Sequence, residues 1–473
     1  MLTFADVLEA LTGTRPEAAS LLISEAAIDS RQVIPAGMFV ALPGERVDGH
    51  DYVEQAFKRG AHLALIQRDL DIHCPVIDLR KGNLGPQMTI PVPPFALRVE
   101  DSLKALQDIA RFWRRKHNLR VIGITGSVGK STTKELIAEV LGLRYRVLKN
   151  PGNLNNEIGL PLTLLHLSPG HQVAVLEMGF YVPGEISFLC DLALPQIGVI
   201  TNIGTVHAER AGSQETIAKG KAELVQALPP APEGVAILNY DDPWVQPMAE
   251  QTRANVFFYG LDPRADLWAD NIESLGLKGI RFQLHFQNEV LHVRIPLIGR
   301  HSVHTALRAA AVGLVEGMTW SEIVAGLRRS HSQLRLVVVH TDNGALLVDD
   351  SYNASPESTL AALNLLEEIE GRKVAVLGDM LELGLYEQEG HEIVGRRAAE
   401  VASILVTVGT LGKKIADAAR KSGLPEEAIV ICSDVPQAVE VLQKLLVQGD
   451  VALIKGSHGL RMDRIAAALE VQE

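Results

Sequence analysis

Apolar and polar residues along this chain follow two different periods, which alternate from one segment to the next. Short runs rich in Val, Ile and Leu, such as residues 121–125, have the composition of buried strands. Longer stretches follow them, such as residues 134–141, in which apolar residues recur every three or four positions as on one face of a helix. This alternation predicts parallel sheets flanked by helices, and therefore an α/β fold. The strand pattern recurs at residues 173–176, 198–202, 345–350, 373–379, 403–409 and 451–456.

The chain is too long for a single hydrophobic core. It has 473 residues, whereas single cores stop growing at about 250–300 residues. In residues 1–98, short β-rich runs alternate with helical ones, and the Pro- and Gly-rich stretch at 81–94 is either an exit linker or a long loop. A further alternation of strands and helices begins near residue 331. We therefore expect domains at residues 1–98, 99–330 and 331–473.

Composition narrows the class of protein. An apolar content of 47% excludes a mainly disordered chain, and a formal net charge of −12 argues against a nucleic-acid-binding surface. The three cysteines, Cys74, Cys190 and Cys432, are odd in number and lack metal-ligand spacing, which suits packing roles in a reducing compartment. No apolar run reaches membrane-spanning length. We expect a cytoplasmic protein that neither inserts into a membrane nor binds nucleic acid.

The sequence TGSVGKST at residues 125–132 joins a predicted strand to a predicted helix. A glycine-rich turn in this position points backbone N–H groups at phosphate oxygens. Lys130 would meet the β- and γ-phosphates of a nucleoside triphosphate, and Ser131 would bind magnesium. The alternative is an ordinary turn that uses glycine only to reverse direction, but the order of strand, turn, lysine and hydroxyl favours phosphate binding. Because Ile124 stands where the strict motif has glycine, the sequence predicts a particular subtype of phosphate loop.

Three further polar residues lie at or just beyond predicted strand ends, where active groups of parallel sheets gather. Glu177 closes the strand at 173–176, and a carboxylate there can hold magnesium directly or through water. Its alternative role is to cap a helix or face solvent. Taken singly, His207 is more often packed or solvent-facing than a ligand, and Lys221 is more often solvated. Their joint placement favours a site.

Other polar stretches allow two interpretations. The amide-rich segment at 150–161 could hydrogen-bond a polar substrate or form a set of Asx turns. The segments at 29–33 and 42–51 concentrate small, polar and basic groups between predicted strands, and they are either surface loops or a binding site.

Several motifs together resemble those of the Mur ligases, over nearly the whole chain. They are TGSVGKST at 125–132, NLNNEIGLP at 153–161, EMG at 177–179, the run from TNIG at 201–204 to His207, and DSYNASP at 350–356. The segments DSR at 29–31, GERVDGH at 44–50, GDMLELG at 378–384 and KGS at 455–457 are similar to those of the dipeptide-adding branch of this family.

The resemblance implies three domains and an activity. An N-terminal α/β domain would bind the UDP part of the acceptor, a central parallel-sheet P-loop ATPase domain would follow, and a C-terminal Rossmann-like α/β domain would close over the site. ATP would phosphorylate the terminal carboxylate of UDP-N-acetylmuramoyl-tripeptide. The amino group of D-alanyl-D-alanine would then attack the acyl phosphate, giving an amide, ADP and phosphate in peptidoglycan precursor synthesis. The implied cofactors are ATP, two Mg²⁺ ions and a carbamylated Lys221, and we expect a monomer.

The resemblance also assigns roles to residues. Lys130, Glu177, His207 and Lys221 would be catalytic, with Ser131, Glu177, His207 and Lys221 as magnesium ligands. The nucleotide would contact Gly126, Ser127, Val128, Gly129, Lys130, Ser131, Thr132, His301, Arg335, Asp350 and Asn353. The acceptor and the dipeptide would contact Ser30, Arg31, Gly44, Asp48, His50, Asn155, Asn156, Asp379, Lys455 and Ser457.

This sequence departs from the family pattern at three places. Ser302 and Thr305 stand where the family has two asparagines, one of them near adenine, which puts the adenine contacts in doubt. His458 replaces the arginine expected after KGS, which puts one contact to the peptide or dipeptide in doubt.

Three alternatives to the dipeptide-adding activity are weighed. Another ligase of the superfamily is the first, either one that adds an amino acid at the preceding step or a folylpolyglutamate synthase. The diaminopimelate-adding enzyme is expected to carry the tetrapeptide DNPR in its third domain, which this sequence lacks. A P-loop switch or transport ATPase would leave the N-terminal DGH motif unexplained. If the chain were an inactive binding module, we would expect Lys130, Glu177 or His207 to be replaced, and all three are present.

Overall fold

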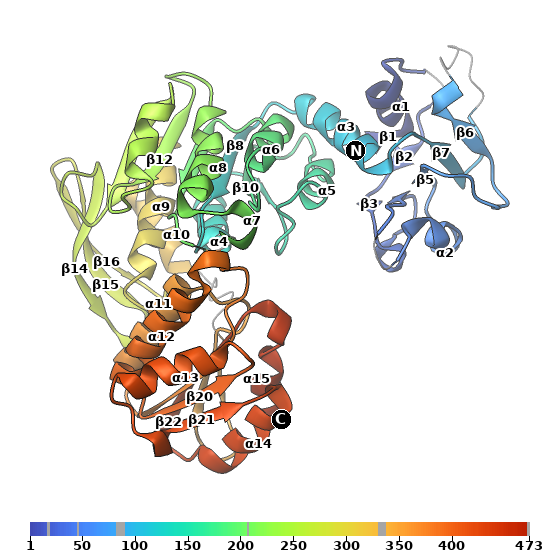
Figure 1. Ribbon diagram of the computed structural model, residues 1–473. Coiled ribbons are helices and arrows are strands. Elements are labelled where there is room, and N and C mark those ends of the chain that lie inside the picture. The colour runs from blue at the N-terminus through green and yellow to red at the C-terminus, as the bar shows by residue number, and fades with distance from the viewer. Residues whose placement is uncertain (17–18, 45–46, 82–89, 206–207, 330–336, 471–473) are drawn as a thin grey trace. The chain divides into compact units, whose positions relative to one another are not determined.

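The structure is a computed structural model that describes residues 1–16, 19–44, 47–81, 90–205, 208–329 and 337–470 (Figure 1). It divides into two compact units, and the boundary between them passes through the strand β8 (Arg120–Thr125). Unit 1 comprises Met1–Gly123, Arg144–Gly179 and Glu185–Gln196. Unit 2 comprises Ile124–Leu143, Phe180–Gly184 and Ile197–Glu473.

A parallel five-stranded sheet forms the N-terminal part of unit 1, in the strand order β3-β4-β5-β7-β6. Its strands are β3 (Ala26–Ala27), β4 (Met38–Val40), β5 (Leu63–Ile66), β6 (Val76–Asp78) and β7 (Phe95–Arg98). β4 and β5 are buried along their whole length, as expected for strands covered on both faces. A two-stranded antiparallel ribbon, β1 (Leu2–Thr3) and β2 (Leu22–Ile23), lies outside this sheet, and the helices are α1 (Phe4–Thr12) and α2 (Val53–Lys58).

The central sheet has nine strands in the order β16-β15-β14-β13-β12-β11-β8-β10-β9. The pairs β9–β10, β11–β12, β12–β13 and β13–β14 are parallel, whereas β14, β15 and β16 form an antiparallel extension. Besides β8, the strands are β9 (Val147–Lys149), β10 (Val173–Glu177), β11 (Ile197–Ile200), β12 (Val235–Asn239), β13 (Asn255–Gly260), β14 (Leu267–Ser274), β15 (Ile280–Phe286) and β16 (Glu289–Ile295). The helices of this region are α3 (Ser102–Arg115), α4 (Lys130–Leu141), α5 (Gly159–Leu165), α6 (Glu185–Ala193), α7 (Ala208–Ala211), α8 (Gln214–Gln226), α9 (Ser302–Val315) and α10 (Trp320–Arg329).

A six-stranded sheet forms the C-terminal part of unit 2, in the order β17-β18-β22-β19-β20-β21, with β17 antiparallel to β18 and the other pairs parallel. Ala375 and Leu377 of β19 belong to one apolar cluster, and Val374 and Val376 to a second one. Because alternate residues of a strand point to opposite faces, the two clusters cover the two faces of the sheet. The strands are β17 (Val337–His340), β18 (Leu346–Asp349), β19 (Arg372–Gly378), β20 (Ile404–Val408), β21 (Ile429–Cys432) and β22 (Asp450–Lys455). The helices are α11 (Pro356–Glu368), α12 (Glu387–Val401), α13 (Gly412–Lys421), α14 (Val435–Leu445) and α15 (Asp463–Leu469).

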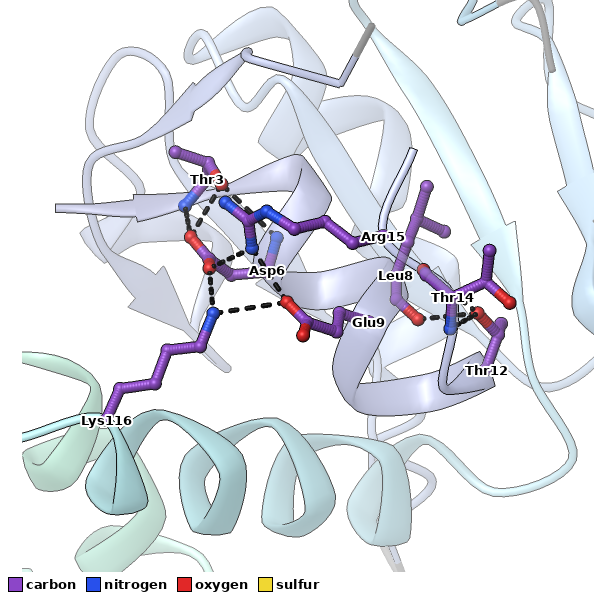
Figure 2. Close-up of polar contacts among 8 residues, drawn as sticks. All are labelled: Thr3, Asp6, Leu8, Glu9, Thr12, Thr14, Arg15 and Lys116. Carbon is purple, nitrogen blue, oxygen red and sulfur yellow. Dashed lines mark hydrogen bonds and ion pairs between the residues drawn. The ribbon is translucent and has the colours of Figure 1, made fainter. Parts of the chain in front are cut away.

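A cluster of four paired charges joins α1 to the end of α3 within unit 1. Figure 2 shows Arg15 and Lys116 converging on Asp6 and Glu9. Arg15 Nη1 lies 2.7 Å from Asp6 Oδ1 and 2.8 Å from Glu9 Oε2, and Lys116 Nζ lies 2.8 and 3.1 Å from the same two oxygens. Asp6 also forms a capping box with Thr3. Burial opposes ionisation of Asp6, but hydrogen bonds from Lys116, Thr3 and Arg15 outweigh it and hold the pKa of the carboxyl well below its usual value.

None of the helices that the structure describes is long and apolar enough to cross a membrane.

Candidate functional site

The predicted phosphate loop occupies residues 126–129, between the end of β8 and the start of α4. Gly129 is the residue before α4 and has a φ of 82°, a left-handed conformation that favours glycine. Lys130 Nζ donates to the backbone carbonyls of Gly126 (2.9 Å) and Ser127 (3.3 Å), so its ammonium group is held against the loop. The backbone N–H groups at the start of a helix attract anions. The sequence-predicted loop therefore has the strand, turn and helix that phosphate binding requires.

Residues after β11 fix the conformation of this loop. The side-chain oxygen of Asn202 accepts the Val128 N–H at 2.9 Å, and the Asn202 carbonyl accepts the Ser127 N–H at 2.9 Å. Gly126 has a φ of 143°, and a Cβ built on it would lie 1.9 Å from Thr201 Oγ1. Only glycine fits at position 126, because any side chain would overlap the threonine hydroxyl.

Lys221 is fully buried on α8 of unit 2. Its Nζ has no hydrogen-bond partner among the described residues and lies 4.8 Å from the centre of the Phe180 ring. Burial, and secondarily the positive charge of Lys130, hold the pKa of Lys221 well below its usual value. This shift favours the neutral form of the amine, which is the nucleophilic form. Its full burial contrasts with the solvated position that the sequence alone would suggest, and buried lysines with a shifted pKa are candidates for functional residues.

Glu177 closes β10 in unit 1 and is almost fully buried, at 2% exposure. Asn155 Nδ2 donates to Glu177 Oε1 at 2.8 Å and orients the carboxylate. Asn150 holds the backbone of the same residue, because its side chain accepts the Glu177 N–H and donates to the Glu177 carbonyl. Asn156 instead accepts the Gly159 N–H at 2.9 Å, at the start of α5. The amide-rich segment thus forms an Asx cap, one of its two expected roles, and it also orients Glu177. The expected hydrogen bonds to a polar substrate stay a prediction.

Polar residues also gather at the carboxyl ends of the C-terminal strands in unit 2. Lys455 is buried, and its Nζ donates to Asp350 Oδ2 at 2.6 Å and to the Asn353 carbonyl at 3.0 Å. Asp379 Oδ1 accepts the Gly412 N–H at 2.7 Å, and Ser457 Oγ accepts the Leu381 N–H at 2.8 Å. Five predicted residues therefore lie along one edge of the C-terminal sheet and fix its loops.

A cavity of about 510 Å³ lies in unit 2, lined by residues that precede α9 and by residues of α11 and α12. Its lining includes Arg300 and His301, which precede α9, and Glu357 from α11. Glu357 Oε1 also accepts the Thr205 N–H at 3.1 Å. His301, one of the predicted nucleotide contacts, thus lines this cavity.

The predicted UDP-binding residues of unit 1 lie in two loops. Ser30 donates to Gln55 Oε1 at 2.9 Å, and the exposed Arg31 pairs with Asp29. His50 is buried: its Nδ1 lies 2.6 Å from Asp48 Oδ1, and its Nε2 accepts the Gln67 N–H at 3.0 Å. Because both ring nitrogens are engaged, His50 supports the loop from within. The backbone at Gly44 approaches Val47 closely: a Cβ built on Gly44 would lie 2.6 Å from the Val47 carbonyl oxygen.

Two predicted residues, His207 and Arg335, lie outside the described residues. Reasoning from the sequence missed three others: Asn202 as the support of the loop, Phe180 beside Lys221, and the buried Arg308, whose Nη2 would lie 3.3 Å from a Cβ on Gly129. Asn202 stands inside a quoted motif, which was a usable signal. Arg308 lies in an ordinary helical pattern that gives no such signal.

Comparisons with known proteins match this chain from end to end. Family models match at residues 22–114 (Mur ligase family, catalytic domain), 124–313 (Mur ligase middle domain) and 334–458 (Mur ligase, glutamate ligase domain). UDP-N-acetylmuramoyl-tripeptide–D-alanyl-D-alanine ligase of Bacillus subtilis is 35% identical, over 99% of this chain and 98% of that protein. The Escherichia coli enzyme of the same name is 34% identical, over 96% and 95%.

Solved structures agree. A crystal structure of MurF from Acinetobacter baumannii has a TM-score of 0.84 at 30% identity and covers 99% of both chains. MurF ligase from Thermotoga maritima in complex with ADP has a TM-score of 0.78 at 28% identity, over 95% of this chain and 97% of that one. The expected fold, with its α/β sheets and three domains, is confirmed. The chain belongs to the Mur ligase family.

Proposed function

We propose that this chain is an ADP-forming amide ligase that joins D-alanyl-D-alanine to UDP-N-acetylmuramoyl-tripeptide in peptidoglycan precursor synthesis. The observation that carries the proposal is an intact phosphate loop in a chain that matches ligases of that name over almost its whole length. The reaction needs ATP because a carboxylate is a poor acyl donor until one of its oxygens becomes a phosphate leaving group. We place the domain boundaries near residues 98 and 330, and we expect a monomeric enzyme of the cytoplasm.

In this proposal the phosphate loop holds the ATP. Backbone N–H groups of residues 126–132 bind phosphate oxygens, and Lys130 leaves the loop carbonyls to meet the β- and γ-phosphates. Because charge builds up on the transferred phosphoryl group, a cation at this position lowers the barrier. The C-terminal residues Asp350 and Asn353, together with His301 beside the cavity, are proposed to contact the nucleoside part.

Lys221 is proposed to carry a carbamate. Its neutral Nζ attacks the carbon of CO₂, the new N–C bond forms as a C=O π bond opens, and the amine proton leaves to solvent. The buried Nζ, which has no hydrogen-bond partner among the described residues, fits this modification. The negative charge of a carbamate would attract the nearby Lys130, whereas a charged amine there would repel it. Burial would destabilise a positively charged lysine in the same place, because the charge would lose its hydration.

Mg²⁺ prefers oxygen ligands, and oxygen is what most of the side chains proposed as its ligands offer. Ser131, Glu177 and a carbamate on Lys221 would supply hydroxyl and carboxylate oxygens, and His207 is proposed to hold the second ion. When bound, Mg²⁺ neutralises phosphate charge during transfer. Asn155 keeps the Glu177 carboxylate in one orientation, which suits a ligand more than a surface acid.

The deciding experiment measures phosphate release by the purified chain with ATP, magnesium and UDP-N-acetylmuramoyl-tripeptide, with and without D-alanyl-D-alanine. We expect release that depends on the dipeptide, together with an amide product of matching stoichiometry. Single amino acids, including D-alanine, serve as control acceptors. Release without the dipeptide, or equal release with one amino acid, would contradict the proposed function.

A further inference from the structure

Arg308 is a buried arginine next to the phosphate loop. It lies on α9 of unit 2, with 4% of its surface exposed. Its Nη2 lies 3.3 Å from the point where a Cβ on Gly129 would stand, and Gly129 is the loop residue directly before Lys130. The guanidinium group therefore lies against the part of the loop from which α4 begins.

The described residues that hold Arg308 are neutral. Nη2 donates to Thr305 Oγ1 at 2.8 Å, and Nη1 donates to Tyr259 Oη at 3.3 Å. Nε is buried and has no hydrogen-bond partner among the described residues. No carboxylate of the described residues lies within ion-pair distance of Arg308. Asp241, whose charge acts on the same Tyr259, is already used by His304 at 2.8 Å.

A second buried arginine shows how the chain satisfies such a group for structural purposes. Arg114 in unit 1 is also 4% exposed. It donates from Nε to the Ala193 carbonyl at 2.7 Å and from Nη1 to the His117 carbonyl at 2.8 Å. Its donors thus end on backbone oxygens at helix ends, where cations are favoured. Arg308 differs, because its Nε–H has no hydrogen-bond partner among the described residues.

An unbalanced buried cation is costly, so its charge should be met by an anion that binds. The adjacent loop is built to bind one. A guanidinium group presents a planar fork of N–H donors that matches phosphate oxygens, and it stays charged at every working pH.

We propose that Arg308 is a nucleotide-binding residue of this chain, which donates from its free N–H groups to the phosphate chain of the nucleotide on the loop at residues 126–132. The inference rests on the proposed binding of ATP to that loop. Tyr259 and Thr305 act as positioning residues, because they hold the two terminal nitrogens and thereby aim the guanidinium plane. Neither the phosphate-loop motif nor the strand-end residues predict this contact.

The test compares Arg308→Gln and Arg308→Met with the parent chain in calorimetric titrations with ADP and with adenosine, without any acceptor or dipeptide. A hydrogen bond to a charged group is worth about a 10- to 100-fold change in affinity. We therefore expect ADP to bind about 10- to 100-fold more weakly to both variants, while adenosine binding stays the same. Arg114→Gln is the matched control: it should lower the melting temperature and leave ADP affinity unchanged.

Stability without nucleotide separates this role from a structural one. Because the proposed partner of Arg308 is absent then, both variants should melt at or above the temperature of the parent chain. ADP affinity within two-fold of the parent, an equal loss for adenosine and ADP, or variants that fail to fold without nucleotide would each overturn the inference. A parent chain that binds ADP but forms no amide would remove the proposed function and leave the result for Arg308 standing.

Discussion

Two regions of this molecule treat their ionisable side chains in opposite ways. In the cluster of Figure 2, Arg15 and Lys116 each contact both Asp6 and Glu9, so every cation there has a carboxylate partner within the chain. Beside the phosphate loop, Lys221 and Arg308 are more deeply buried, yet neither has an ion-pair partner in the described part of the chain. Ion pairs within the chain stabilise the fold, whereas the roles that we propose for Lys221 and Arg308 depend on groups that bind to them.

The direction of the pKa shifts expresses the same contrast. Hydrogen bonds from cations outweigh the burial of Asp6 and lower its pKa, which favours the charged form. Burial and a like charge lower the pKa of Lys221, which favours its neutral form. The first shift belongs to a group held by ion pairs within unit 1, and the second to the group for which we propose a chemical role.

The largest expected effect comes from Lys221→Ala. If the carbamate supplies a magnesium ligand, the variant should lose about 10²- to 10³-fold in turnover, in the range found for the loss of one electrostatic stabiliser. The measurement is dipeptide-dependent phosphate release. Short carboxylic acids should partly restore it, because they bring the missing carboxylate.

Lys219→Ala is the control for this variant. Lys219 lies two residues earlier on the same helix, is exposed and pairs with Glu215 at 2.8 Å. Its removal should leave turnover unchanged. Full activity of the unrescued Lys221→Ala chain would contradict the carbamate role.

Asp6→Asn tests the opposite region. The substitution keeps the shape of the side chain but removes its charge from two cations, and it should lower the free energy of unfolding by about 1.5–3 kcal/mol. Urea unfolding followed by circular dichroism measures this, and turnover of the folded fraction should not change. Lys104→Met, which breaks the exposed pair with Asp108, should cost less than about 1 kcal/mol. Equal losses for the two variants would show that the cluster is no more than surface charge.

Lys221→Met should have a small effect of the opposite sign on stability. Replacing an unpartnered buried amine with an apolar side chain of similar length removes a desolvation cost, so the free energy of unfolding should stay the same or rise by about 1 kcal/mol. A marked loss of stability in the same urea experiment would mean that Lys221 stabilises the fold. It would then not differ from the Asp6 cluster in this respect.

The pH dependence of the Asp6 cluster gives the smallest effect. The folded-state pKa of Asp6 lies below its unfolded value of 3.8. Its contribution to stability is therefore complete well above pH 3.8 and is lost as the pH falls through the folded-state pKa. The stability difference between the parent and Asp6→Asn should be constant from about pH 7 to 5 and shrink below about pH 4. A difference that persists unchanged at low pH would contradict the assignment.

Local patterns predicted much of this architecture. The alternation of strand and helix periods gave the α/β class, and the predicted strand at 121–125 and helix at 134–141 correspond to β8 and α4. These features succeed because they depend on neighbours in sequence. The phosphate loop is of the same kind, since its turn, lysine and hydroxyl are contiguous.

The features that the sequence did not predict depend on contacts between residues that are far apart in the chain. Arg308 reads as one more residue of an alanine-rich helix, and only the fold brings it to Gly129. The burial of His50, with both ring nitrogens engaged, is likewise decided by Asp48 and by the distant Gln67. The sequence singled out Lys221 by its placement with Glu177 and His207, and the family resemblance gave it a role, but that its Nζ has no hydrogen-bond partner among the described residues is a property of packing. Sequence spacing cannot report which buried groups remain unsatisfied.

The close approach of Gly126 to Thr201 has a consequence for how this loop can evolve. A methyl group at position 126 would collide with the threonine hydroxyl, so alanine there requires a prior change at position 201. Thr201→Ala would clear the oxygen, but the φ of 143° at Gly126 would still disfavour any side chain. Position 126 is therefore restricted twice, by Thr201 and by its own backbone conformation, and a change at position 201 alone does not open the loop to substitution. In a deep mutational scan, position 126 should tolerate no replacement even in a Thr201→Ala background.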